Sequence, residues 1–379
     1  MSQKISIPSN GIRMKASSRR RFLKKIGQSV GIAMVSQMTL FPTFSTYGQQ
    51  DICNKEAENL FIMALADCGL IVQQSGNTPS LSVASGKQED LCQALRCLAE
   101  TMKQQDVTSA NSCTDLVKIR WSTNEILTLG PNEIVIATPS LANALVRAYS
   151  IHPNCSVYAS GGTSDSISAD ALSIGPLSNA VACGGHAPLS LGGNGGHAVA
   201  YATGNTISHG GFGSEGGRGG KAASTSFQAN ATALAIGGGG GAHLISSGGA
   251  GGDADADSRA GSAMAIGGSG GEANLAGNGG NGGNARAESG IGSAEAQGGA
   301  GGHLAECCGN GGHGGHAEAV STGNVASARG GAGGTGRGQG QRGGNGGNAT
   351  AKGNPSLVTV GQAGVGEERA INGKAGEAD

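Results

Sequence analysis

A fixed repeat of about 32 residues constrains the fold of this chain more than any other feature. A glycine doublet recurs ahead of a run of alternating small residues, in steps of 32, 31, 32 and 32 residues, at Gly219-Gly220, Gly251-Gly252, Gly282-Gly283, Gly314-Gly315 and Gly346-Gly347. A constant period in this range is typical of stacked repeat architectures, in which each repeat contacts only its neighbours. We therefore expect residues 161–354 to form one repeat array.

The repeat that begins at Gly251 indicates how the chain runs within one copy. Small and polar residues alternate strictly over residues 253–258. Successive side chains of a strand point to opposite faces, so the two alanines and the serine of this run share one face. Gly261 is then followed by alanines in the opposite parity, Ala263 and Ala265. A bulge or a tight turn at the glycine would produce such a change.

The small side chains of the array leave two ordered architectures open. Alanine, serine and glycine cannot build an ordinary apolar core, so main-chain hydrogen bonds and close packing must supply the stability. The alternating alanine runs favour a β-solenoid of short strands, whereas glycine triplets such as those in residues 279–284 favour bundled polyproline-II-type helices. We expect a hybrid in which strands dominate. The alternative is a disordered glycine-rich tract.

The most specific motif of the chain lies near its N-terminus. Six residues fill the fixed positions of the pattern S-R-R-x-F-L-K, and a moderately apolar segment follows them: Ser18, Arg19, Arg20, Phe22, Leu23 and Lys24. The motif resembles the twin-arginine signal of bacterial export. That resemblance implies that residues 1–50 are a signal peptide and that the twin-arginine translocase exports the protein to the periplasm, cell surface or medium. The apolar segment is too short and too polar for a comfortable membrane span.

Residues 51–160 are expected to form a small, mainly helical domain that contains cysteines. Apolar residues at helical spacing predict helices over residues 54–68 and 88–104. Thr138-Pro139 predicts the start of a third helix that ends at Tyr149. The chain would then be multi-domain, with the Gly/Ala-rich array after the helical domain and a terminal strand or cap in residues 355–379.

Seven of the nine cysteines precede position 184. Disulfides are the favoured state of cysteines in an exported protein. The spacing does not define their connectivity, although Cys92 and Cys97 flank one helical face and should not pair with each other. The disulfide candidates are Cys53, Cys68, Cys92, Cys97, Cys113, Cys155 and Cys183.

A second cluster, inside the array, contains residue types that bind metals: His303, Cys307, Cys308, His313 and His316. Imidazole and thiolate groups suit zinc or copper. However, His303 and His316 follow a glycine doublet, in a slot that holds other polar residues in other repeats, and two adjacent cysteines are poorly placed to bind one ion. We therefore expect solvent-facing histidines, a disulfide and no cofactor. A zinc or copper site is the alternative.

The glycine-rich repeats resemble the PGRS repeats of mycobacterial surface proteins, most closely in residues 279–285. That resemblance implies a structural role at the cell surface or in the medium. The net charge of −1 gives no reason to expect a nucleic acid as a partner. We expect an exported bacterial structural or adhesive protein, not an enzyme, whose partner is a cell-surface protein or a polysaccharide.

Two other function classes are kept as alternatives. In the first, the chain is a ligand-binding module whose flat faces of small residues recognise ice or a polysaccharide. In the second, it is a secreted enzyme with its site in residues 51–160. No nucleophile–base pair can be recognised there, and His152 is the only histidine of that segment.

Overall fold

The structure is a computed structural model that describes residues 55–379, except for residues 76–77, 85–90, 113–117, 124, 141–144, 164–166, 188–191, 307, 368–370 and 379. The twin-arginine motif and three of the cysteines, Cys53, Cys113 and Cys307, lie outside these residues. The segment from Cys53 to Asp379 forms one unit by its contacts, and all that follows concerns that unit.

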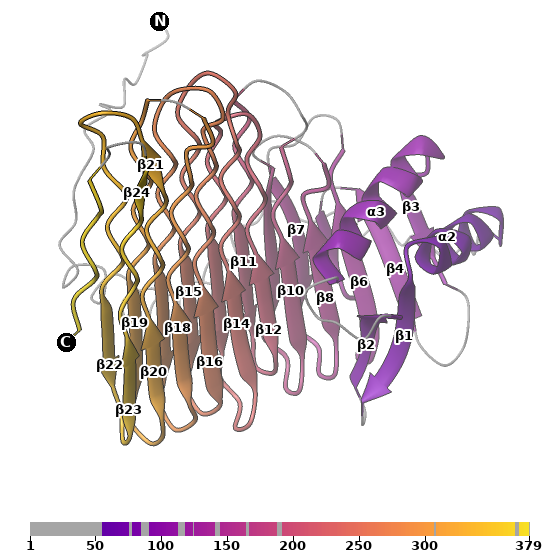
Figure 1. The fold of residues 1–379 in the computed structure, drawn as a ribbon. Coiled ribbons are helices and arrows are strands. Elements are labelled where there is room, and N and C mark those ends of the chain that lie inside the picture. Colours follow the sequence, from indigo (N-terminus) through magenta and orange to yellow (C-terminus); the bar gives the residue numbers. More distant parts are fainter. Residues whose placement is uncertain are drawn as a thin grey trace, which may run out of the picture. The chain divides into compact units, whose positions relative to one another are not determined.

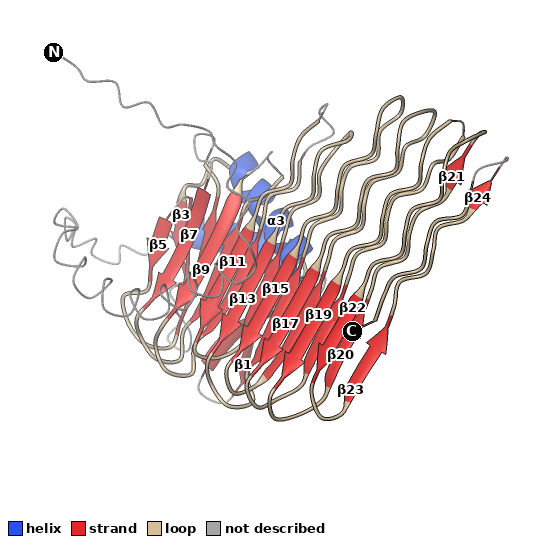
Figure 2. Ribbon diagram, turned by 90° about the vertical axis from the view of Figure 1, so that its left-hand side faces the viewer, coloured by secondary structure: helices blue, strands red, loops and turns tan. Residues whose placement is uncertain are grey.

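Two sheets of short strands face each other across a narrow core, and the chain alternates between them (Figures 1 and 2). In both sheets neighbouring strands are parallel, apart from the β3–β4 pair. The nine-strand sheet contains, in spatial order, β5 (Glu125–Leu127), β7 (Leu145–Ser150), β9 (Ser168–Ser173), β11 (Ala198–Ala202), β13 (Ala222–Ser226), β15 (Ala254–Ser258), β17 (Ala285–Ser289), β19 (Ala317–Ser321) and β22 (Ala349–Lys352). The eleven-strand sheet contains β3 (Ser109–Asn111), β4 (Lys118–Thr123), β6 (Glu133–Thr138), β8 (Ser156–Ser160), β10 (Asn179–Cys183), β12 (Thr206–His209), β14 (Thr232–Ile236), β16 (Ser262–Ile266), β18 (Ala294–Gln297), β20 (Ala326–Arg329) and β23 (Ser356–Thr359).

Alanine side chains fill the space between the two sheets. In β15, Ala254, Ala256 and Ser258 are buried while the aspartates between them lie on the outer face. Ala263 and Ala265 of β16 are buried against them from the other sheet. The predicted alternation is therefore confirmed. The change of parity comes from the turn that carries the chain from one sheet to the other, and not from a bulge within one strand.

After β10 each coil, meaning one passage of the chain through both sheets, extends beyond the strands into two glycine-rich arms, which appear as the long tan loops of Figure 2. The arms are joined by hydrogen bonds between glycines of successive arms: Gly252 N–H donates to Gly238 O at 2.8 Å, and Gly268 N–H donates to Gly252 O at 2.9 Å. A Cβ atom on Gly252 would lie 1.9 Å from the carbonyl oxygen of Gly220. Glycine at the crowded positions and hydrogen bonds between chains are typical of bundled polyproline-II-type chains. The repeated parallel strands are consistent with the solenoid-like part of the expected hybrid.

The prediction of a mainly helical domain in residues 51–160 is wrong. Two helices are present among the described residues, α2 (Lys55–Asp67) and α3 (Leu91–Gln104), close to where they were expected. The third expected helix is replaced by the strand β7, whose side chains alternate between buried and outward positions and which pairs with β9 over six residues. Strands take up more of this segment than helices do, and β4, β6 and β8 belong to the same eleven-strand sheet as the array. No sheet boundary falls near residue 160.

The two helices and a hairpin cover one end of the eleven-strand sheet (Figure 1). The hairpin consists of β1 (Leu70–Ser75) and β2 (Thr78–Val83). Leu95, Leu98 and Met102 of α3 are fully buried and belong to one core cluster with Trp121 and Tyr158 of the sheet. No helix in the described part of the chain is both long and apolar enough to cross a membrane.

Two disulfides tie this end together. Cys68–Cys97 joins the chain after α2 to α3, and Cys92–Cys183 joins α3 to β10. They confirm four of the disulfide candidates, and Cys92 and Cys97 indeed do not pair with each other. The prediction that Cys155 forms a disulfide is wrong. Its buried thiol is not disulfide-bonded and donates to the carbonyl oxygens of Gly130 and Pro153. At the other end of the sheets, β23 confirms the expected terminal strand, and β21 (Gly336–Arg337) pairs with β24 (Gly366–Glu367).

Candidate functional site

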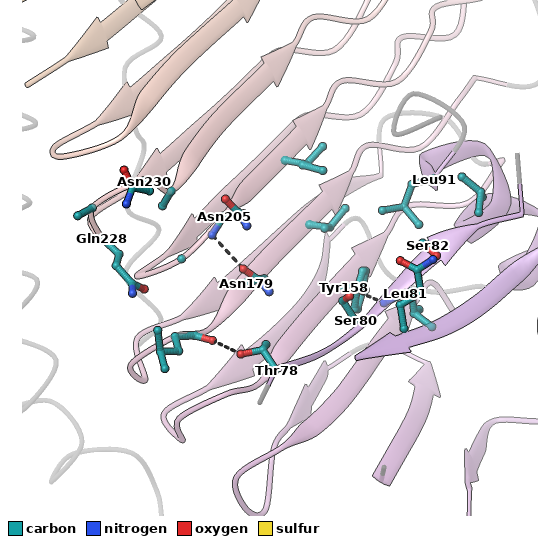
Figure 3. A pocket seen from close by; sticks show the side chains of 18 residues that line it. Thr78, Ser80, Leu81, Ser82, Leu91, Tyr158, Asn179, Asn205, Gln228 and Asn230 are labelled. Atoms are coloured by element: carbon teal, nitrogen blue, oxygen red, sulfur yellow. Dashed lines mark hydrogen bonds between the residues drawn. The ribbon is translucent and has the colours of Figure 1, made fainter. Parts of the chain in front are cut away.

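A groove of about 410 Å³ lies between the β1–β2 hairpin and the outer face of the eleven-strand sheet (Figure 3). Residues of β8, β10 and β12 form its sheet side. The turn between β13 and β14 contributes residues 228–231. The groove therefore combines segments that are far apart in the sequence and that the stacking of coils brings together.

The floor of the groove is apolar and firmly held. Val181 and Ile207 lie opposite each other on adjacent strands, and Leu81 reaches the groove from the hairpin. Leu81 N–H donates to the hydroxyl oxygen of Tyr158 at 2.7 Å, which attaches the hairpin to the sheet. Burial raises the pKa of Tyr158 to about 12, so this hydroxyl stays neutral at physiological pH.

Side-chain amides form a row at the edge of the groove. Asn205 N–H donates to Asn179 Oδ1 at 2.9 Å, and Thr232 N–H donates to Asn205 Oδ1 at 2.9 Å. Each carbonyl oxygen is thus occupied by the next coil, which orients the amide. The Asn205 Nδ2 group makes no hydrogen bond to another described residue, so it remains a donor for a ligand. Gln73, Gln228 and Asn230 add further amides.

The hydroxyl groups of the hairpin complete the polar lining. Thr78 Oγ1 donates to the carbonyl oxygen of Leu177 at 2.8 Å. Ser82 Oγ is buried and has no hydrogen-bond partner within the described part of the chain. Among the described residues that line the groove, none carries an acidic or basic side chain.

A second polar cluster, the His186–His209 cluster, lies beside α3. Arg96 of α3 is buried and donates through Nε and Nη2 to the carbonyl oxygen of Gly184. His186 stacks on Phe212, with ring centroids 4.6 Å apart, and its Nδ1 accepts the backbone N–H of Phe212 at 2.9 Å. Burial, followed by the nearby Arg96 charge, lowers the pKa of His186 to about 3 and that of His209 to about 4. Both imidazoles are therefore neutral at physiological pH.

The histidines of the expected metal cluster are exposed, as predicted, and each accepts a hydrogen bond from the next coil. The Nδ1 atoms of His303, His313 and His316 accept the backbone N–H groups of Thr335, Asn345 and Asn348, at 2.9 to 3.0 Å. Cys308 is disulfide-bonded. In the described residues no group of three or more His, Cys, Asp or Glu side chains is arranged to hold a metal ion. The slot after the glycine doublet thus serves hydrogen bonding between coils.

The comparisons with known proteins assign no family to this chain. No family model matches the sequence, and no curated protein matches it. A solved structure, the nine polyproline type II helical bundle springtail antifreeze protein from Granisotoma rainieri, is 24% identical over 44% of this chain and 89% of that chain, with a TM-score of 0.12. With that TM-score the likeness carries no conclusion about this chain.

Proposed function

We propose that this chain is an exported bacterial protein with a structural or adhesive role, whose rigid array presents its outer faces to a cell-surface protein or a polysaccharide. The observation that carries the proposal is the continuity of hydrogen bonds between coils. One seam of glycine-to-glycine hydrogen bonds runs through Gly220, Gly238, Gly252 and Gly268 and continues as far as Gly376. A scaffold of this kind keeps its surface groups at fixed intervals over its whole length.

The outer faces of the coils supply the groups that a partner would meet. Because inward positions are filled by alanine and serine, outward positions can vary without disturbing the core. They carry ion pairs between coils, such as Lys221 with Asp253 at 2.8 Å and Arg286 with Glu318 at 3.6 Å. Exposed pairs of this kind contribute little stability, so their residues are available for recognition.

Export of the protein is proposed from two features. The motif at residues 18–24 resembles the twin-arginine signal. The disulfides Cys68–Cys97 and Cys92–Cys183 suit an oxidising compartment outside the cytoplasm, where such bonds persist. A role in binding rather than catalysis agrees with the lining of the groove, where amides, hydroxyls and apolar groups meet.

The proposal is tested by cell fractionation together with amide hydrogen exchange. The full chain, expressed in bacteria that have a twin-arginine translocase, is expected outside the cytoplasm, whereas the variant Arg19→Lys/Arg20→Lys should stay inside. In the exported protein the amides of Gly238, Gly252 and Gly268 should exchange slowly, because each is hydrogen-bonded to a neighbouring arm. Fast and uniform exchange over residues 219–364 would exclude the rigid scaffold, and a wild-type protein found only in the cytoplasm would exclude export.

A further inference from the structure

The described residues that line the groove are all electrically neutral, and this limits what the groove can bind. In the part of the lining that the structure describes, the polar side chains are five amides, three hydroxyl groups and the neutral Tyr158: those of Gln73, Thr78, Ser80, Ser82, Asn179, Asn205, Gln228 and Asn230 besides Tyr158. A charged ligand would lose hydration on entering and would find no opposite charge among these side chains. A purely apolar ligand would cover the amides and leave their donors without partners. The lining therefore favours a neutral ligand that is rich in hydroxyl groups.

The arrangement of these groups indicates a ligand with two kinds of face. Asn179 and Val181 lie on the same face of β10, and Asn205 and Ile207 repeat this order one strand further along. An amide row and an apolar row therefore run side by side across the strands, with a step of about 4.8 Å between strands. A pyranose ring has a C–H face and an edge of hydroxyl groups, so it can lie on the apolar row while its edge meets the amides. Amides both donate and accept, as sugar hydroxyls do.

We infer that the groove between the β1–β2 hairpin and the eleven-strand sheet binds a neutral oligosaccharide. The Nδ2 donor of Asn205, which makes no hydrogen bond to another described residue, meets a sugar hydroxyl. Gln228 and Asn230 close the groove from the turn between β13 and β14. This inference extends the proposed function by naming what one site on the scaffold binds, and the two can fail separately.

Isothermal titration calorimetry of the full chain with defined sugars tests the inference. The probes are cellohexaose, maltohexaose and N-acetylchitohexaose, with hexagalacturonate as the charged counterpart. At least one neutral hexasaccharide should bind and hexagalacturonate should not, because the described lining of the groove offers no positive side chain to balance its carboxylates. The inference is overturned if none of the three neutral sugars binds, whatever the outcome for export or amide exchange.

Two variants locate the binding in the groove with little effect on the fold. Asn205→Asp keeps the Oδ1 acceptor for Thr232 N–H but replaces the Nδ2 donor and adds a negative charge. Gln228→Ala/Asn230→Gly removes two amides, and glycine suits position 230 because Asn230 has a φ of 63°. Each variant should weaken sugar binding at least about tenfold, the loss expected when one or two hydrogen bonds to the ligand are removed.

The matched control is Asn281→Asp, on an arm. Asn281 Oδ1 accepts the backbone N–H of His313 just as Asn205 Oδ1 accepts that of Thr232, but Asn281 does not line the groove. This variant should bind the sugar as the wild type does. Unfolding transitions of all variants show whether each is folded. Wild-type affinity in both folded groove variants, or an equal loss in the control, would overturn the assignment of the groove.

Discussion

At the scale of single residues, side-chain acceptor atoms that recur from coil to coil align the outer arms. Asn281 Oδ1 accepts the backbone N–H of His313, and His313 Nδ1 accepts that of Asn345, each at 2.9 Å and 32 residues along the chain. Asparagine and histidine both carry an acceptor at the δ1 position, so either can occupy the slot. Asp253 serves in the same way for Asn284. The residue types vary along the column, but the hydrogen bond does not.

The His186–His209 cluster predicts that the protein loses stability in acid. Folded-state pKa values of about 3 and 4 lie below the ordinary value of 6.5, so the unfolded chain binds more protons between these limits. The contribution of the two neutral histidines to the free energy of unfolding is fully present above pH 6.5. It falls as the pH is lowered towards 4, by up to about 1.4 kcal/mol per pH unit for each histidine. Denaturant unfolding at pH 7, 6, 5 and 4 measures this slope.

A variant separates the two histidines from other titrating groups. Burial and the nearby Glu288 raise the pKa of Asp257 to about 6, which acts in the opposite direction. His186→Asn/His209→Asn leaves Asp257 in place and keeps the δ1 acceptor for Phe212 N–H. The free energy of unfolding of this variant should depend less steeply on pH between 6.5 and 4 than that of the wild type. An equal pH dependence in variant and wild type would show that the two histidines do not cause the loss of stability in acid.

At the scale of elements, the glycine arms depend on the absence of side chains. In Gly252→Ala the new Cβ would lie 1.9 Å from a backbone oxygen of Gly220, which cannot move without displacing a whole arm. We expect a loss of about 3 kcal/mol in the free energy of unfolding, as for overpacking in a dense core. The control is Gly130→Ala, whose Cβ would meet only the Glu133 side chain, at 3.6 Å. Denaturant unfolding of both variants measures the difference, and similar losses would mean that the arms are loosely packed.

How far each element could be predicted depends on where its determinants lie. The alternation in residues 253–265 is local, so the alanine strands could be read from the sequence. Residues 145–150 contain the same kind of alternation, but Pro139 ahead of them favoured a helix, and only the pairing with β9 decides for a strand. Which histidine meets which backbone amide depends on the stacking of coils. This is why the histidines of the array could be interpreted as metal ligands.

The candidate site could not be predicted from the sequence for a similar reason. Its amides come from the hairpin, from β10, from the residue before β12 and from the turn after β13, and no short segment contains more than a few of them. The sequence offered one signal of the amide row, the recurrence of asparagine at Asn179 and Asn205, roughly one coil apart. Their shared face follows only from the parallel register of β10 and β12. Local patterns indicate strands, whereas a groove between distant strands requires the register.

At the scale of the whole unit, order is maintained in two different ways along its length. From β13 onwards each coil is held by its two neighbours through strand pairing, the alanine core and the glycine seams. Near β8 and β10 the eleven-strand sheet is covered by larger apolar side chains of α3, and the disulfide Cys92–Cys183 joins this helix to the sheet. In a stacked array a local change spreads mainly to adjacent repeats. The two ends should therefore respond separately to damage.

Removal of the disulfide between α3 and β10 tests this separation. Cys92→Ala/Cys183→Ala opens a link between residues 91 positions apart, and we expect a loss of about 2 to 4 kcal/mol in the stability of the helix-covered end. Amide exchange should become faster in α3 and in the β1–β2 hairpin, because their packing on the sheet then opens more often. Exchange in β15, β17 and β19 should stay at the wild-type rate, since their hydrogen bonds are made within the array.

Cys155→Ala is the control for the loss of a thiol without the loss of a link. Cys155 is buried and free, so its replacement should cost less than removal of the disulfide and should leave exchange in α3 unchanged. Faster exchange throughout β13 to β22 in the Cys92→Ala/Cys183→Ala variant would contradict the separation. It would mean that the helix-covered end acts as a template on which every later coil depends, and the array could then not be treated as a sum of contacts between neighbouring coils.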